Sequence, residues 1–176
     1  QIGFNRRLSH DGIVQMMPNP DAHYEKTTPI LSVERDDGER LLMVNHGCHP
    51  TGLGASPVIC ADFPGAMRAY LTDDAHAQVV MFMQGAAGDI KQGAQVGDQV
   101  GWIADYDSVN ALGMHLGKCV VDALGDLQPI EGPLRAMSRT VAAPLKDRVS
   151  SDEALTRAEN RLVSRELMEH WGAVVD

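Results

Sequence analysis

The chain runs twice from a short apolar segment through a glycine-rich polar loop into a helical segment, and this order constrains the fold most strongly. The first apolar segment ends at Asn45 and leads into a loop at residues 46–62, and the second, residues 78–83, leads into a loop at residues 84–101. Such an order is typical of an α/β layer fold. We therefore predict a mixed sheet with helices packed on it, in which loops at the C-terminal ends of the strands form the site.

Local patterns predict the elements of the N-terminal half. Residues 1–30 contain turn-forming residues and little hydrophobic periodicity, so we expect an ordered loop there. An Asp-Gly pair at residues 37–38 separates apolar residues 29–34 from 40–45, which predicts a hairpin. Asp62 stands two residues before a proline at the start of an apolar segment, so we expect it to cap a helix.

The C-terminal half is expected to contain two more helices and a strand. Asp107 or Ser108 would cap a helix with one apolar stripe reaching Leu124. Residues 134–145 are expected to form a strand. Residues 150–153 offer a capping box for a last helix that is highly charged on its outer side. The apolar side chains expected to face inward from that helix are Leu155, Ala158, Leu162 and Trp171.

Composition excludes several classes of function. A length of 176 residues suffices for one domain with a sizeable apolar core, and 15 basic against 24 acidic residues give a net charge of −9. An acidic surface disfavours binding to nucleic acid or anionic membranes. No apolar run approaches the roughly 20 residues that a membrane span needs. The compartment (secreted or periplasmic if a leader was removed, or cytoplasmic) and the oligomeric state stay open.

The three cysteines lack the spacing of a thiolate zinc site. Cys48, Cys60 and Cys119 are odd in number and contain no C-x-x-C pair, so they describe neither a disulfide framework nor a metal site. We expect reduced and mostly buried thiols.

The loop at residues 46–62 contains the candidate metal ligands. His46 and His49 would both point to one ion only if the chain turned at Gly47, because residues three apart in an extended chain face opposite sides. On spacing alone, two structural histidines are the favoured interpretation. The Asp62 carboxylate either caps the helix or holds the second ring nitrogen of a ligating histidine.

The loop at residues 84–101 and the N-terminal arginines are candidates for substrate contacts. The small residues at 85–88 allow a substrate to approach the backbone, whose N–H groups would stabilise an oxyanion, or they form a tight turn that Asp89 stabilises. No phosphate-binding motif is present. Arg6 and Arg7 would clamp a carbonyl or a carboxylate, although such arginines more often are solvated or bind backbone carbonyls.

Together, these motifs resemble the neutral/alkaline non-lysosomal ceramidase family, in the N-terminal catalytic domain of its broad ceramidase-like branch. They stand in family order: GFNRR at residues 3–7, PNP at 18–20, CHPT at 48–51, ADFPG at 61–65 and QGAAGD at 84–89. The resemblance covers residues 1–145. Residues 146–176 would then be a charged helix leading into a further C-terminal part, so we expect residues 1–176 to be a single partial domain of a longer hydrolase.

The resemblance implies a role for several residues. The family are zinc amidohydrolases, and the ceramidases proper cleave the N-acyl bond of the sphingolipid ceramide. His49 matches a zinc ligand and Arg6 an arginine of the active site, whereas His46 falls where relatives carry another residue. Gly88 and Asp89 match the loop of the catalytic serine. Lys91 occupies the place of that serine.

One zinc ligand, His49, is therefore expected in this chain, with Asp62 as its orienting partner. The family's other ligands, a His-x-His segment upstream and a Glu and a Tyr downstream, would lie outside it. The candidate catalytic residues are Arg6, Gly88, Asp89 and Lys91. The predicted function is hydrolysis of an amide or ester bond in a small-molecule amide or lipid by zinc-activated water. The alternative is a non-catalytic α/β module that binds a small ligand or a protein partner.

Overall fold

The computed structural model describes residues 2–10, 12–54, 56–96, 99–133, 135–142, 150, 152–156 and 159. The chain divides into two compact units, Gln1–Ile130 and Glu131–Asp176, and each is described by itself. All the candidate site residues lie in the first unit.

A three-stranded mixed sheet organises the first unit. Strand β4 (Ile30–Glu34) pairs antiparallel with β5 (Arg40–His46), and β5 pairs in parallel with β6 (Val79–Gln84). Gly38 in the β4–β5 turn has φ +85°, a conformation that glycine adopts without strain. The hairpin and the mixed α/β class are thus confirmed.

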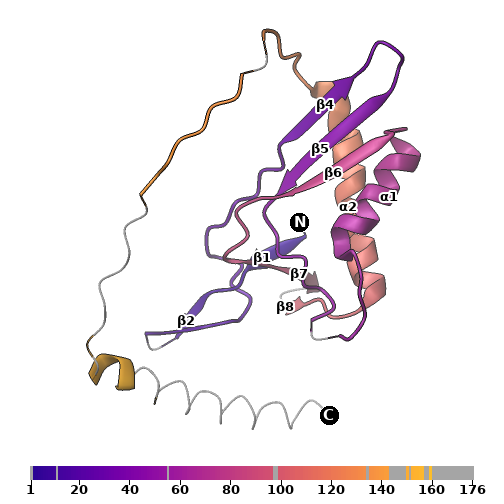
Figure 1. Cartoon of the computed structure of the whole chain (residues 1–176). Helices are drawn as coiled ribbons and strands as arrows, with labels where there is room; N and C mark the ends of the chain where they lie inside the picture. Colours follow the sequence, from indigo (N-terminus) through magenta and orange to yellow (C-terminus); the bar gives the residue numbers. More distant parts are fainter. Residues whose placement is uncertain are drawn as a thin grey trace. The chain divides into compact units, whose positions relative to one another are not determined.

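Two helices lie against each other on one side of this sheet (Figure 1). They are α1 (Asp62–Asp74) and α2 (Tyr106–Ala123), and a short 3-10 turn, η1 (Leu124–Asp126), follows α2. The Asp105 carboxylate caps α2, because its Oδ1 accepts a hydrogen bond from the Ser108 N–H at 2.8 Å. The helix thus begins earlier than the predicted caps at Asp107 or Ser108.

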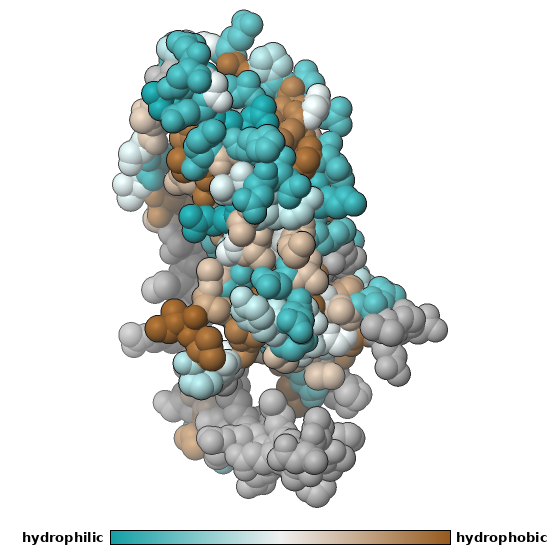
Figure 2. Space-filling model, turned by 90° about the vertical axis from the view of Figure 1, so that its right-hand side faces the viewer, coloured by the Kyte–Doolittle hydropathy of each residue, from teal (hydrophilic) through white to brown (hydrophobic). Residues whose placement is uncertain are grey.

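The core lies between the helices and the sheet. From α1, Phe63, Met67 and Leu71 are fully buried, and they meet alternate residues of β5, such as Leu42 and Val44. The period of the helix and the alternation of the strand each place one apolar face inward. On the side that bears the helices, the outer surface is largely hydrophilic, with scattered apolar side chains (Figure 2).

The expectation of an ordered loop at residues 1–30 was wrong where three short strands form. The segment forms β1 (Gly3–Asn5), β2 (Leu8–His10) and β3 (Ile13–Gln15). Strand β2 pairs with β3, while β1 joins a second sheet in the order β1-β7-β8, in which β7 is Ile90–Val96 and β8 is Gln99–Trp102. Strands of three residues show no periodicity, and β1 pairs with a strand more than 80 residues away, so no local pattern indicated them.

In the second unit, residues 135–142 form no strand, contrary to expectation, and the rest of the predicted strand lies outside the described residues. Ser150 Oγ accepts a hydrogen bond from the Glu153 N–H at 3.2 Å, as the capping motif predicts, and residues 152–156 are helical. Leu155 is described and exposed, whereas Ala158, Leu162 and Trp171 lie outside the described residues. No helix in the described part of the chain has the length and apolar character of a membrane span.

Candidate functional site

The predicted loops at residues 46–62 and 84–101 meet at one end of the mixed sheet, but most of the second forms strands β7 and β8 and, among its described residues, only 85–89 are loop. Because β5 and β6 are parallel neighbours, their C-terminal ends lie side by side, and the Gly85 N–H donates to the His46 carbonyl at 3.0 Å. The Gln84 amide donates to the carbonyls of His46 and Cys48 at 3.2 and 3.1 Å. Further along, the His49 N–H donates to the Ile90 carbonyl at 3.2 Å. The first loop thus lies directly beside residues 85–90. The part of this loop around His49, residues 85–90 and Asn5–Arg7 are together called the loop cluster below.

The His49 ring is held in one tautomer. Its Nδ1 is hydrogen-bonded to the Ala87 carbonyl oxygen. A carbonyl only accepts hydrogen bonds, so the neutral ring carries its proton on Nδ1 and leaves the lone pair on Nε2. Metal-binding histidines use this arrangement, in which one nitrogen donates to a carbonyl and the other coordinates the ion. In His49, Nδ1 is thus engaged with a protein acceptor, and Nε2 keeps its lone pair.

His46 has a different environment. Its Nδ1 lies 2.7 Å from the Thr28 hydroxyl, and its ring packs edge-on against Phe63 with 6.3 Å between ring centroids. Burial lowers the pKa of His46 below its usual 6.5, so the ring is neutral at pH 7. These contacts tie His46 to the apolar core.

Asp62 does not cap α1 in the predicted way. Residue Ala61 occupies the N-cap position without a side-chain hydrogen bond, and Asp62 has φ +52°, in the left-handed region. Its carboxylate turns into the molecule and accepts from the Gly52 N–H at 2.9 Å, from its neighbour Phe63 at 2.8 Å and from the Gln92 side chain. The predicted hydrogen bond from Asp62 to the His49 ring is not among these contacts. Asp62 instead fixes Gly52, three residues after His49.

Gln92 is a polar residue of this region that the sequence did not single out. It is fully buried on β7, and its amide donates to Asp62. A Cβ built on Gly52 would lie 2.0 Å from Gln92 Oε1 and 2.3 Å from a Val109 methyl, so a side chain at position 52 would force these buried side chains to move. A lone glutamine in a short strand carries no sequence signal for burial.

Arg6 lies beside Gly88 and Asp89, two of the other candidate catalytic residues. Its N–H donates to the Asp89 carbonyl at 2.7 Å, and its Nη2 donates to the Gly88 carbonyl at 3.1 Å. The Asp89 carboxylate accepts from the amide of Asn5, which is only 5% exposed and was missed although it belongs to the motif before Arg6. Arg6, Gly88 and Asp89 therefore form one cluster.

The turn at residues 87–90 leaves donors unused. The Ile90 N–H donates back to the Ala87 carbonyl at 3.2 Å. The N–H groups of residues 86–89 have no acceptor among the described residues. None of residues 85–89 has a positive φ, so the N–H groups do not form a nest of alternating αR and αL residues. Within the described residues, the turn therefore presents separate N–H donors rather than a nest.

Lys91 follows this turn at the second position of β7. Its Nζ lies 5.4 Å from the centroid of the Trp102 ring, an arrangement typical of a cation–π contact. The backbones of Lys91 and His49 form a parallel bridge. Lys91 is thus adjacent to the cluster, with its ammonium group on an aromatic ring.

The cysteines differ from one another. Cys48 is buried, and burial raises the pKa of its thiol to about 12, so it stays protonated. Cys60 and Cys119 are exposed, which corrects the expectation of mostly buried thiols. Cys60 precedes α1, and Cys119 lies outside the buried stripe of α2.

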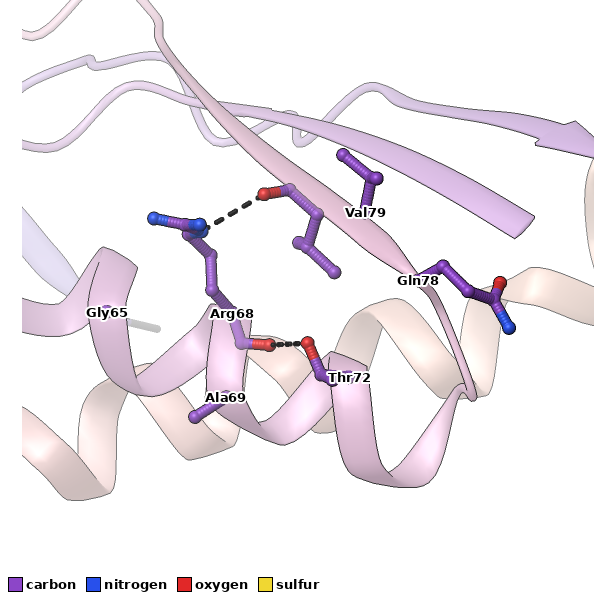
Figure 3. Close-up of a pocket in the computed structure, with 7 residues that line it drawn as sticks. Gly65, Arg68, Ala69, Thr72, Gln78 and Val79 are labelled. Atoms are coloured by element: carbon purple, nitrogen blue, oxygen red, sulfur yellow. Dashed lines mark hydrogen bonds between the residues drawn. The ribbon is translucent and has the colours of Figure 1, made fainter. Parts of the chain in front are cut away.

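Two hollows flank the sheet. A pocket of about 120 Å³ adjoins the loop cluster and is bounded by His46, Gly47, Ile90 and residues of β1 and the segment at 24–26. A larger one of about 500 Å³ lies between α1 and β6, where Arg68 Nε donates to the Val80 carbonyl at 3.0 Å (Figure 3). None of the predicted site residues lines the larger pocket.

Within the described residues, no group of three or more His, Cys, Asp or Glu side chains is arranged to hold a metal ion. A zinc ion at His49 Nε2 would therefore need further ligands from outside the described residues.

Comparisons with known proteins give little further assignment. No family model matches the sequence, and no curated protein matches it. Among solved structures, neutral ceramidase from Pseudomonas aeruginosa is similar, with 19% sequence identity and a TM-score of 0.44 over 55% of this chain. The chain spans 16% of that protein's length. A likeness at this TM-score does not establish a shared fold.

Proposed function

We propose that the loop cluster is part of the active site of a zinc-dependent hydrolase that cleaves an amide or ester bond, with an N-acyl compound as substrate. The observation that carries the proposal is the His49 ring, whose Nδ1 is occupied by the Ala87 carbonyl and whose Nε2 is left for a metal. The motif resemblance to ceramidases supports the same chemistry.

Zinc bound at Nε2 would supply a Lewis acid that polarises a carbonyl and lowers the pKa of water. The residues of this chain would orient the metal ligand and hold its loop in place. The hydrogen bond to Ala87 orients the imidazole, while the Asp62 carboxylate holds the backbone at Gly52 and so limits movement of the loop that carries His49. In this proposal, the remaining zinc ligands lie outside the described residues.

The turn at residues 86–89 would bind the reacting carbonyl. Its N–H groups have no acceptor among the described residues, and N–H groups are the kind of donor that a developing oxyanion requires. Arg6 holds this turn through the Gly88 and Asp89 carbonyls and would orient the substrate. Lys91 would contribute a positive charge next to the turn, although it does not replace a serine nucleophile.

Zinc titration of the longest native form of the protein, in which the other expected ligands would be present, tests the proposal. We expect about one zinc per chain by elemental analysis and a saturable binding isotherm, with affinity reduced at least roughly tenfold in His49→Ala. His46→Gln is the matched control, because His46 lies in the same segment but has its own hydrogen bond to Thr28 and packs against Phe63. Circular dichroism of both variants would show that they remain folded.

Two outcomes would contradict the proposal. Equal zinc affinity of the wild type and His49→Ala would remove His49 as a ligand. Absence of saturable zinc binding by the wild type would favour the alternative, a non-catalytic α/β module that binds a small ligand or a protein partner.

A further inference from the structure

Two guanidinium groups meet at one backbone oxygen of the loop cluster. Arg6 Nη2 and Arg7 Nη2 lie 3.1 and 3.4 Å from the Gly88 carbonyl oxygen, so the two nitrogen atoms are at most 6.5 Å apart. Like charges at this distance repel each other unless an anion or solvent screens them. One neutral carbonyl oxygen does not neutralise two cations.

Neither arginine has a carboxylate partner among the described residues. The chain carries 24 acidic against 15 basic residues, so carboxylates are plentiful. In the β4–β5 hairpin, Arg35 and Arg40 both form ion pairs with acidic neighbours. Near Arg6, the Asp89 carboxylate instead accepts from Asn5, and Arg6 Nε is buried without an acceptor. Among the described residues, the pair of arginines therefore has no carboxylate that balances its charge.

The backbone around the two arginines is fixed in advance. The Arg7 N–H donates to the Asn5 side-chain oxygen at 2.8 Å, and the Asn19 amide donates to the Arg7 carbonyl at 2.9 Å. Asn5 itself is 5% exposed and is held at the other end by the His23 carbonyl. Such a scaffold keeps the guanidinium groups near each other before a ligand arrives.

We propose that Arg6 and Arg7 form a binding site for an anionic group of the substrate, a carboxylate or a phosphate, next to the turn that would bind the scissile carbonyl. The inference rests on the proposed hydrolase function and narrows its substrate to N-acyl compounds with a negative charge near the amide. Guanidinium groups bind both anions through paired N–H donors, and Arg7, which is exposed, is the residue that gives the site its second charge.

Binding of small probes to the full chain without zinc tests this site independently of hydrolysis. The probes share one skeleton: N-acetylglycine carries a carboxylate, N-acetylaminomethylphosphonate carries a phosphate analogue, and N-acetylglycinamide is neutral. The readout is the NMR shift of the Arg6 and Arg7 Nε–H groups during titration. We expect the preferred anion to bind at least about tenfold more tightly than the neutral amide, and its binding to weaken with added salt. The tighter of the two anions identifies the source of the charge.

Variants make the test specific. Arg7→Gln should lower the affinity for the preferred anion about tenfold and leave the weak affinity for the neutral amide unchanged, whereas Arg7→Lys should restore part of the loss. Arg35→Gln is the matched control, since Arg35 is an exposed arginine far along the chain with its own acidic partners. Equal binding of charged and neutral probes, binding unaffected by Arg7→Gln, or no saturable binding of either anion would each overturn the inference. Anion binding by the longest native form of the protein, together with its failure to bind zinc, would overturn the hydrolase proposal and leave this anion site in place.

Discussion

The helix layer and the loop cluster are held together by different forces. Between α1, α2 and the mixed sheet, the contacts are apolar, and side chains such as Phe63 and Met67 are fully buried. In the loop cluster, the contacts are hydrogen bonds between segments far apart in the chain, such as Arg6 with Gly88 and His49 with Ala87. Apolar burial is non-directional and supplies stability, whereas hydrogen bonds fix positions and tautomers. Variants in the helix layer should therefore leave ligand binding by the loop cluster largely unchanged. Variants in the loop cluster should leave the stability that the helix layer supplies largely unchanged.

The largest effect is expected in the helix layer. Met67→Ala removes a fully buried side chain and should lower the free energy of unfolding by about 2–5 kcal/mol, because the transfer energy is lost and a cavity remains. Met114 on α2 is 51% exposed, so Met114→Ala should change the free energy of unfolding by less than about 0.5 kcal/mol. Urea denaturation measures both.

If the helix layer and the loop cluster are energetically independent, folded Met67→Ala should bind zinc with the affinity of the wild type. A similar loss of stability in the two methionine variants would show that the helix layer is not the core of the unit.

An intermediate effect is expected at Asp62, where the two regions meet. Asp62→Asn keeps a residue that tolerates the left-handed conformation but places an amide N–H₂ where a carboxylate oxygen accepts from Gly52 or Gln92. We expect the free energy of unfolding to fall by about 1–3 kcal/mol. Asp73→Asn, at an exposed position of the same helix, is the control and should be close to neutral. Equal stability of the two variants by urea denaturation would mean that the inward hydrogen bonds of Asp62 contribute nothing.

The smallest effect is a dependence on pH that originates at His46. Burial lowers the pKa of His46 in the folded protein, so the unfolded chain binds the proton more readily. The stabilisation is complete above the unfolded pKa near 6.5 and declines as the pH falls below it, by at most about 1.4 kcal/mol per pH unit. The difference in unfolding free energy between the wild type and His46→Gln, measured from pH 7.5 to 5, should follow this course. His115→Gln controls for the loss of an exposed imidazole, and a difference for His46→Gln that stays constant over this range would contradict the account.

Local patterns in the sequence predicted some elements because their determinants are adjacent in the chain. The hairpin of β4 and β5 follows from an Asp-Gly turn between apolar segments, and the meeting of the two loops follows from parallel strands. By contrast, the role of Asp62 was predicted from its neighbours, while two of its partners, Gly52 and Gln92, lie 10 and 30 residues away. The position of Asp62 shortly before a proline does not indicate that its carboxylate turns into the molecule.

The candidate site shows the same limit. The motifs placed Arg6, His49 and Gly88 together, but no spacing indicated that the Ala87 carbonyl would select the tautomer of His49. Asn5 and Gln92 were missed because a single buried amide leaves no pattern in the sequence.

The most direct test of the central claim is the tautomer of His49, measured by ¹⁵N NMR on the full chain with labelled histidine. The account predicts that Nδ1 carries the proton and Nε2 the lone pair, and that the Nε2 chemical shift changes when zinc is added. A proton on Nε2 in the zinc-free protein, together with an Nε2 shift that zinc leaves unchanged, would contradict it.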